Sequence, residues 1–597
     1  MYVKRRTLGA HLKTNGQCEF KIWAPFLKEL MVEIIPKDNK PYRLPMNKDE
    51  EGYFLLVAEG IHPKDRYYYC SGSERLPDLA ADYLPEGING PAEILLKQNG
   101  CVWKGRTLES YIIYELHVGT YTPEGTFSAI IPHLSELKEL GITALEIMPV
   151  AQFSGNRNWG YDGVFPFAVQ NTYGGPEELK KLVHACHQLN IAVILDVVYN
   201  HIGPEGNYFE KFGPYFTDKY KTPWGKSLNF DDAYSHQVRN YFIENALHWF
   251  IEYGIDALRL DALHAIVDNS AYPFLEELAD EVAALSKEQN YLYYLIAESS
   301  ANDTRLVRDK EQYGFGIHAQ WNDEFHHALH SLITKERHGY YEDFGEIQLF
   351  VKAYQEGFAY SGEYSRFRKR PHGMSSANIP ADRFIVFMQN HDHIGNRPMG
   401  DRLTQTLSPM QIKFYASLLF FSPYIPLIFM GEEYGDTAPF QYFISHSDPD
   451  LIRAVREGRK KEFSFMHHEA IPDPQSEQTF INSKLNHALK NQQKYKGIWQ
   501  FYKRLIELRT TKPALYTLSK ENMELKLIDS KLLFITREMN HHSLCLVANF
   551  SLHEEDYSSH LNTHTWKLII NSSESEPSNN KIPSFGILIF EKGNPSE

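Results

Sequence analysis

The sequence predicts an α/β protein in which a (β/α)8 TIM barrel lies between an N-terminal β-sandwich domain and a C-terminal β-domain. Strand-like apolar segments alternate with helical patterns over the middle of the chain, as they do in proteins with a parallel sheet. Four of these segments deliver an acidic side chain at or just beyond their C-terminal end, namely Asp196, Asp261, Glu298 and Asp392. A barrel gathers its functional residues at that end of its strands, so these carboxylates are expected at one site.

The first part of the chain, residues 1–100, has the pattern of an all-β domain. Short segments such as 20–25, 30–35, 53–57 and 67–70 are rich in apolar and aromatic residues, and Gly, Pro, Asn and Asp separate them. This regular spacing predicts a small β-sandwich.

The barrel is expected over residues 101–512, including its inserted loops. Helical apolar spacing appears at 130–140, 176–190 and 235–253, between strand-like runs. The eight predicted strands span 111–118, 144–150, 191–197, 255–260, 291–297, 319–322, 384–390 and 425–433. Eight strands that alternate with helices predict closure into a barrel.

After the eighth strand the pattern changes twice. Residues 440–486 are polar and predicted to be irregular, and 495–509 have helical spacing. From 513 to 597 the chain returns to short strands, such as 532–536 and 543–550. The sequence therefore predicts a C-terminal β-domain over 513–597.

Composition limits the classes of function. The chain has 597 residues, of which 43% are hydrophobic and 23% are charged, as is typical of a large globular protein. Its net charge of −15 argues against nucleic-acid binding as the main task. No membrane interaction is expected, because the most apolar stretch, 415–430, is interrupted by Pro423 and Pro426.

The cysteines indicate a reducing compartment. Five are scattered along the chain without metal-ligand spacing, and their number is odd: Cys18, Cys70, Cys101, Cys186 and Cys545. Disulfide-bonded proteins usually carry even, regularly spaced sets. The basic N-terminal residues are not followed by an apolar segment of the kind found in signal peptides. We therefore expect a cytoplasmic protein.

The stretch from Gly254 to His264 is the centre of the predicted site. Arg259 and Asp261 are two residues apart, so on a strand both side chains point to the same face. A nearby guanidinium favours the ionised form of a carboxylate, which is the form that a covalent nucleophile needs. Taken alone, the pair is equally consistent with a structural ion pair at the end of a strand.

Four motifs together resemble those of the α-amylase clan of glycoside hydrolases. They are Asp196–His201, Gly254–His264, Ile296-Ala297-Glu298 and Asn390-His391-Asp392, in the order that the clan has them. One such motif is a weak signal, whereas four on successive barrel strands are specific. The resemblance extends over nearly the whole chain, including the leading segment Phe20–Pro25, which is similar to the carbohydrate-binding-like domain of this clan.

The flanking residues are similar to the maltooligosyltrehalose trehalohydrolase family within that clan. This closer resemblance rests on Gly141–Phe153, Gln320–His330 and Gln389–Arg397. Two positions depart from the family pattern, because His393 stands where glutamine is expected and Glu324 where aspartate is expected.

The resemblance implies roles for three carboxylates. Asp261 corresponds to the nucleophile, Glu298 to the proton donor and Asp392 to the residue that stabilises the transition state. Two carboxyl groups roughly 5 Å apart allow a covalent intermediate and retention of configuration. The alternatives are a cap of the following helix for Glu298 or Asp392.

The resemblance and the residue types also suggest substrate contacts. Tyr161 is expected to stack on a sugar ring, and Asp196 to brace Arg259. The histidines of 326–330 lack a complete metal-ligand pattern, so we interpret them as substrate contacts or packing. The full predicted set is Tyr161, Asp196, His201, Arg259, His264, Asp323, Glu324, Phe325, His326, His327, His391, His393, Asn396 and Arg397.

The expected activity is hydrolysis of the α-1,4-glucosidic bond next to the terminal trehalose of maltooligosyltrehalose, with retention and without a metal or other cofactor. A glycogen-branching or debranching enzyme of the same clan is the alternative, and a non-catalytic glucan-binding protein is a second alternative from another class. The sequence does not indicate an oligomeric state.

Overall fold

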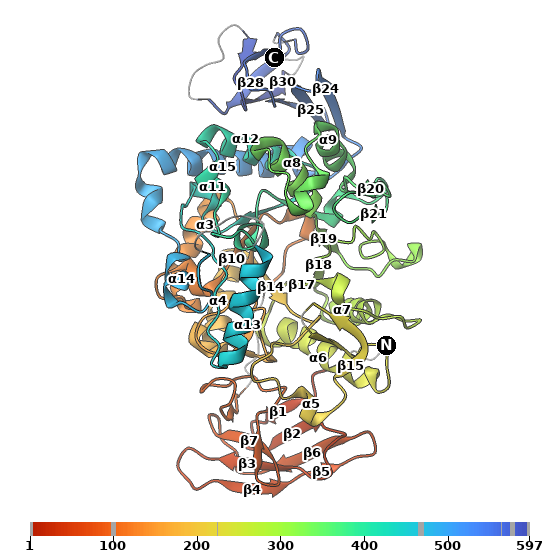
Figure 1. The fold of residues 1–597 in the computed structure, drawn as a ribbon, viewed down its shortest axis with the longest axis vertical. Coiled ribbons are helices and arrows are strands. Elements are labelled where there is room, and N and C mark those ends of the chain that lie inside the picture. Colours follow the sequence, from red (N-terminus) through yellow and green to blue (C-terminus); the bar gives the residue numbers. More distant parts are fainter. Residues whose placement is uncertain are drawn as a thin grey trace.

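The computed structural model describes residues 4–96, 103–223, 225–463, 471–562, 564–573 and 580–593. Its centre is a closed barrel of parallel strands, which confirms the predicted fold class (Figure 1). The strands in barrel order are β10 (Ile113–Leu116), β11 (Ala144–Ile147), β14 (Ala192–Val197), β17 (Ala257–Leu260), β18 (Tyr294–Ala297), β19 (Ala319–Trp321), β22 (Phe384–Phe387) and β23 (Ile425–Phe429). Each lies within a segment predicted to be a strand.

The barrel interior is layered, and the layers determine where the site forms. A lower layer is apolar and includes Ile113, Ala144, Ile194, Ala257 and Ile296. Successive side chains of a strand point to opposite faces, so the residue two positions further along also faces the interior. At that level the same five strands carry Glu115, Glu146, Asp196, Arg259 and Glu298. A layer of ionisable residues, the ionisable layer, therefore lies on top of an apolar one at the carboxyl ends of the strands.

Helices surround the barrel (Figure 1). The longer ones are α3 (Leu134–Leu140), α4 (Gly175–Gln188), α6 (Ser235–Tyr253), α7 (Phe274–Gln289), α8 (Asp323–Thr334), α9 (Ile347–Glu356), α12 (Pro409–Phe421), α13 (Pro449–Glu462) and α15 (Gln493–Thr511). The shorter ones are α1 (Val118–Tyr121), α2 (Phe127–Ile130), α5 (Phe209–Phe212), α10 (His391–Gly395), α11 (Leu403–Thr406), α14 (Glu477–Asn482) and α16 (Pro513–Tyr516). In the part of the chain that the structure describes, none of the helices is both long and apolar enough to cross a membrane.

The region from 440 to 486 differs from the prediction, because it contains α13 and α14. No residue of α13 is buried, and charged side chains dominate its sequence, so the polar composition of this segment suggests an irregular region. The helix begins at a cap, since the Asp448 carboxylate accepts hydrogen bonds from the backbone N–H groups of Asp450 and Leu451. The segment between β14 and α6 contains α5 and a hairpin, β15 (Phe216–Thr222) with β16 (Gly225–Leu228).

The N-terminal part contains two antiparallel sheets that face each other. One has the order β1 (Gly9–Leu12), β2 (Cys18–Trp23), β6 (Tyr53–Ala58) and β5 (Asn47–Lys48). The other contains β4 (Tyr42–Pro45), β3 (Met31–Ile35), β7 (Arg66–Ser71) and β8 (Glu74–Leu76), with β9 (Ala92–Glu93) paired to β7. The ring of Phe20 meets that of Tyr67 at 5.1 Å between the sheets, as expected for a sandwich core.

The C-terminal sheet lies at the opposite end of the molecule from the N-terminal sheets (Figure 1). Its order is β24 (Met523–Ile528), β25 (Leu532–Met539), β26 (His542–Asn549), β30 (Ile587–Lys592) and β28 (Trp566–Asn571). Short two-stranded pairs complete the fold: β12 (Ala151–Gln152) with β13 (Phe165–Val169), β20 (Tyr364–Ser365) with β21 (Arg370–Pro371), and β27 (Glu555–Asp556) with β29 (Lys581–Ile582). The domain boundaries at residues 100 and 512 stay predictions.

Two buried arginines fasten the C-terminal sheet and α15 to the barrel. Arg537 of β25 donates to the carbonyl oxygens of Ser422 at 2.7 Å and Phe421 at 3.2 Å, where α12 ends. Arg509 of α15 donates to the carbonyl of Phe420 at 3.2 Å and to that of Ser422. Both guanidinium groups thus satisfy carbonyls that a helix C-terminus leaves without partners.

Candidate active site

Arg259 is the central residue of the ionisable layer. Its guanidinium is fully buried and donates from Nη1 to both carboxylate oxygens of Asp196, at 3.0 and 2.8 Å, and to Asp261 Oδ1 at 2.7 Å. Its Nη2 lies 3.7 Å from Glu298 Oε2. Burial lowers the pKa of Arg259, but these carboxylates raise it more, so the group stays charged. One cation therefore holds the carboxylates of three adjacent strands.

Asp261 follows β17 and is held from two sides. Arg259 bonds one carboxylate oxygen, and Asn200 Nδ2 donates to the other at 3.0 Å. The side chain of Asp261 is 12% exposed, so it is oriented by the protein and still accessible. These properties suit a carboxylate that attacks a bound substrate.

Glu298 follows β18 on the next strand. The backbone N–H of Ala262 donates to Glu298 Oε2 at 2.5 Å, and Ala262 adopts a left-handed conformation with φ of 45°. Such a conformation costs an alanine free energy, which is typical of positions where the surroundings constrain a site. Burial raises the pKa of Glu298 to about 8, Arg259 opposes this shift, and the charge of Asp261 adds to it. Glu298 is thus a carboxylic acid at neutral pH and can donate a proton.

Asp392 lies in the first turn of α10 and is the most open of the three carboxylates, with its side chain 44% exposed. Asn396 Nδ2 donates to Asp392 Oδ1 at 3.2 Å, and His391 Nε2 lies 3.6 Å from the same oxygen. The cap of α10 is Asn390, whose side chain accepts a hydrogen bond from His393 N at 3.0 Å. Asp392 is therefore free of the capping role that was its alternative interpretation.

Tyr161, His201 and His391 form the wall beside Arg259. The hydroxyl of Tyr161 donates to Asp196 Oδ2 at 2.6 Å and lies 2.8 Å from His391 Nε2. The rings of Tyr161 and His391 stack, with centroids 5.3 Å apart. His201 Nε2 lies 2.9 Å from the carbonyl oxygen of Tyr161. The structure thus brings these predicted residues together around Asp196.

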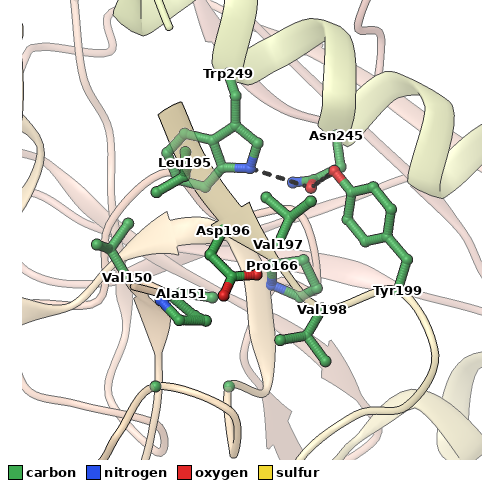
Figure 2. Close-up of a pocket in the computed structure, with 13 residues that line it drawn as sticks. Val150, Ala151, Pro166, Leu195, Asp196, Val197, Val198, Tyr199, Asn245 and Trp249 are labelled. Carbon is green, nitrogen blue, oxygen red and sulfur yellow. Dashed lines mark hydrogen bonds between the residues drawn. The ribbon is translucent and has the colours of Figure 1, made fainter. Parts of the chain in front are cut away.

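A small cavity of about 20 Å³ backs the Asp196 carboxylate (Figure 2). Fully buried Asn245 lines it and accepts hydrogen bonds from the Tyr199 hydroxyl at 2.6 Å and from Trp249 Nε1 at 3.2 Å. Its volume suits about one water molecule, which is too small for a sugar. This cavity therefore belongs to the support of Asp196.

Asp323 and His393 lie on the other side of Asp392. His393 Nε2 is 3.7 Å from Asp323 Oδ1, and the Asp323 side chain is 25% exposed. Burial raises the pKa of Asp323 to about 7, and the charge of Asp392 adds to the shift. The exposed side chains of His264 and Asn396 border the same region. His264 interacts electrostatically with Asp261, and Asn396 donates a hydrogen bond to Asp392.

Several predicted substrate contacts have other partners, and we reassign them. Phe325 is fully buried in the core beside the rings of Phe350 and Tyr354. The carboxylate of Glu324 accepts hydrogen bonds from the backbone N–H groups of Ala359 and Tyr360, at 2.7 and 2.8 Å. Both residues therefore stabilise the fold. The glutamate that replaces aspartate at position 324 supports the loop that contains Ala359 and Tyr360.

The histidines of α8 also pack rather than open to the cleft. His326 bonds the carbonyl of Met388 at 2.5 Å and the hydroxyl of Tyr341 at 2.8 Å, and His393 stacks on it with ring centroids 3.7 Å apart. The ring of His327 stacks on that of Tyr340 at 4.4 Å. Within the described ranges, no group of His, Cys, Asp or Glu side chains has the arrangement of a metal site.

Arg397 is likewise engaged within the protein. It bonds Asp401 Oδ2 at 2.7 Å and Glu336 Oε2 at 2.9 Å, and His330 bonds the same Glu336 oxygen at 2.8 Å. Because burial lowers the pKa of Arg397 but the two carboxylates raise it more, the guanidinium is charged and paired. We interpret this cluster as support for the loop after α10.

Sequence reasoning missed three residues of the site: Asn200, Trp321 and Glu115. Asn200 stood inside a recognised motif, and Trp321 presents its ring to the Arg259 guanidinium at 4.4 Å. Glu115 is buried in β10, where it accepts hydrogen bonds from His391. Glu115 could have been found from the sequence, because it is a charged residue in an otherwise apolar strand and follows the interior-facing Ile113 by two positions.

Comparison with known proteins gives consistent results. The family model for the alpha amylase catalytic domain matches residues 105–224. The malto-oligosyltrehalose trehalohydrolase of Saccharolobus solfataricus is 47% identical over 510 residues, which are 84% of this chain and 87% of the relative. An enzyme of the same name from Mycobacterium tuberculosis is 41% identical and covers 82% of this chain and 86% of its own.

A solved structure agrees with these relatives. The putative alpha amylase of Salmonella typhimurium superposes with a TM-score of 0.90 at 34% identity. The match covers 98% of this chain and all of that one, so the terminal β-domains are shared as well as the barrel.

Proposed function

The chain belongs to the malto-oligosyltrehalose trehalohydrolases and hydrolyses maltooligosyltrehalose with release of trehalose, and we propose that Asp261 is its nucleophile, Glu298 its proton donor and Asp392 its transition-state stabiliser. The observation that carries the proposal is the convergence of Asp261 and Glu298 on one guanidinium. Arg259 of β17 contacts Asp261, which follows the same strand, at 2.7 Å. It also lies 3.7 Å from Glu298, which follows the neighbouring strand β18.

The proposed reaction has two steps. In the first, Asp261 attacks C1 of the glucosyl unit next to trehalose while Glu298 gives its proton to the glycosidic oxygen, so that trehalose leaves with a new hydroxyl. In the second, the Glu298 carboxylate takes a proton from water, and the hydroxide attacks C1 and breaks the bond to Asp261. The maltooligosaccharide is then released with its configuration retained.

The surrounding residues fit these steps. Arg259 and Asn200 orient the nucleophile, and burial keeps Glu298 protonated for the first step. The open carboxylate of Asp392 is available to sugar hydroxyls and to the positive charge that develops at C1. We further propose that Tyr161 stacks on the sugar at the cleavage point, and that Asp323, with His264 and Asn396, contacts the trehalose end.

A matched pair of variants tests the roles. Asp261→Asn and Glu298→Gln should both abolish turnover of maltooligosyltrehalose. With a maltosyl fluoride, whose leaving group needs no proton, Glu298→Gln should still form a covalent adduct, visible as a mass increase of the intact protein that maps to Asp261. An adduct on another residue, or activity in Asp261→Asn, would overturn the assignment.

Membership in this family disfavours the alternative of a branching or debranching enzyme and that of a non-catalytic binding protein. Product analysis on maltopentaosyl-trehalose beside maltoheptaose checks the substrate directly. Free trehalose from the first with little cleavage of the second is the expected result, and equal cleavage would point to a general amylase.

We infer that the enzyme works in the cytoplasm. The support is that Cys18, Cys70, Cys186 and Cys545 are free and buried, as in proteins of reducing compartments. Cys101 lies outside the described residues. Detection of the native protein in a cytoplasmic fraction, and its absence from the culture medium, is the expected result.

A further inference from the structure

Glu115 is a buried carboxylate that the proposed reaction does not use. It faces the barrel interior from β10 and is 1% exposed, directly under the residues that bind the substrate. Both of its oxygens accept hydrogen bonds from one residue, since Oε2 bonds the backbone N–H of His391 at 3.3 Å and Oε1 bonds the Nδ1 of the same histidine. A charge in the barrel core is costly unless it has a specific partner, and His391 is that partner.

The hydrogen-bond pattern around His391 defines its charge state. A carboxylate only accepts hydrogen bonds, so Nδ1 carries a proton toward Glu115. Arg259 donates hydrogen bonds to both oxygens of Asp196, so these oxygens act as acceptors, and the single hydroxyl proton of Tyr161 is directed at Oδ2. The Tyr161 oxygen must therefore accept from His391 Nε2, 2.8 Å away. Both ring nitrogens carry protons, and the ring is an imidazolium.

We propose that Glu115 is a positioning residue that holds His391 as an imidazolium, so that its Nε2–H serves Tyr161 in the free enzyme and a hydroxyl of the bound sugar during catalysis. The proposal deepens the proposed function, because it concerns the same site. It adds to the three carboxylates a cation, the His391 imidazolium, whose charge depends on Glu115, a residue outside the four sequence motifs. A cation 3.6 Å from Asp392 also orients that carboxylate beside the reacting sugar.

The electrostatic surroundings agree with this arrangement. Burial lowers the pKa of His391, but Asp392 and Glu115 raise it more, to about 9. The ionisable groups that face or sense His391 come from all sides: Glu115 (β10), His117 (start of α1), Glu146 (β11), Tyr161, Asp196 (β14), Arg259 (β17), Asp392 and His393 (α10). His117 and His393 have pKa values lowered by burial and do not compete for the proton.

Glu146 provides a matched control. It pairs with Glu115 in the register of β10 and β11 and is equally buried, yet neither of its oxygens has a hydrogen-bond partner in the described chain. Burial and the charge of Glu115 raise the pKa of Glu146 well above its usual range, so it is a neutral acid. Glu146→Gln therefore exchanges one neutral group for another of the same size, whereas Glu115→Gln removes the counterion of His391.

The test is the pH dependence of kcat for maltooligosyltrehalose hydrolysis, expressed as the ratio of variant to wild type. Glu115→Gln keeps an oxygen that can accept from Nδ1 but lets the imidazolium lose its proton near neutrality. The loss of kcat in Glu115→Gln, relative to wild type, is expected to be at least about tenfold larger at pH 7.5 than at pH 5.5. The reason is that the protonated fraction of a histidine with an ordinary pKa of about 6.5 falls about tenfold between these two pH values. Glu115→Asp, which keeps the charge, and Glu146→Gln should both give ratios that do not vary with pH.

A constant ratio for Glu115→Gln over this range would overturn the proposal, even if its activity were low, because a purely structural role lowers activity at every pH. Neutron diffraction from wild-type crystals at pD 7.5 gives a second reading that needs no variant. Deuterium on both ring nitrogens of His391 is expected, and deuterium on one alone would contradict the inference. Failure of the nucleophile assignment would appear separately, as activity in Asp261→Asn.

Discussion

Replacing Arg259 by methionine is expected to damage both stability and catalysis. The guanidinium is fully buried and contacts Asp196, Asp261 and Glu298. Methionine fills much of the volume but leaves three carboxylates without their cation. Removing one partner of a buried ion pair typically costs about 3–5 kcal/mol. We expect a loss of that size in the free energy of unfolding at pH 8. We also expect a fall in kcat/KM of about 100-fold or more, because Asp261, the proposed nucleophile, is no longer oriented.

The pH dependence of this loss identifies its cause. Burial raises the pKa of Asp196 and of Glu298, and removal of the guanidinium raises both further. A carboxyl whose folded pKa lies above its unfolded value contributes full stability below the unfolded pKa and loses it as the pH rises through the folded pKa. The stability deficit of Arg259→Met should therefore be smallest near pH 5 and grow toward pH 8.

Arg402→Met is the control for this experiment. Arg402 is as buried as Arg259, but it donates to backbone carbonyls, those of Ala438 at 2.6 Å and Met430 at 2.7 Å. Its replacement should give a deficit that does not change with pH. Denaturant unfolding of both variants and the wild type at pH 5, 6.5 and 8 provides the measurement. A pH-independent deficit for Arg259→Met would refute the electrostatic reasoning.

Three further predictions concern individual side chains. Glu298 must be protonated to act as the acid, and burial raises its pKa to about 8. In a pH–rate profile, kcat/KM should therefore be constant at neutral pH and fall as the pH rises through about 8. A fall of kcat/KM that begins near pH 5 would exclude this role. Tyr161→Phe keeps the ring but loses the contacts to Asp196 and His391, so kcat/KM should fall about 10- to 100-fold while the denaturation midpoint changes little; an unchanged kcat/KM would contradict the role of the hydroxyl. Arg537→Met removes the donor to the carbonyls of Phe421 and Thr517, whereas Ser422 keeps its bond from Arg509, and should cost about 1–3 kcal/mol in unfolding experiments with kcat unchanged. A loss of kcat with intact stability would show that the C-terminal sheet acts on the site.

The barrel and the position of the carboxylates proposed to be catalytic could be predicted because local patterns encode them. Apolar strands that end in a charged residue can be recognised in the sequence alone. The alternation of side chains along a strand then places Arg259 and Asp261 on one face. Apolar runs indicate most of the barrel strands in this way, whereas β19 is only three residues long and contains Gln320, so its pattern is weaker.

Contacts between distant segments could not be predicted from these patterns. Nothing in the sequence near Phe325 distinguishes a core residue from a substrate contact, because the helix α8 carries aromatic and imidazole side chains on several faces. The pairing of Glu115 with His391 joins residues 276 positions apart, and it depends on barrel closure. Helix α13 could not be predicted either, because its sequence is mainly charged and it buries no residue.

The stereochemistry of hydrolysis tests the central claim most directly. Proton NMR of the first products of maltooligosyltrehalose cleavage, recorded before mutarotation, reports the anomeric form of the new reducing end. A covalent intermediate on Asp261 predicts that the released maltooligosaccharide appears first as the α-anomer. Initial appearance of the β-anomer would mean direct attack by water and would contradict the role of Asp261 as the nucleophile.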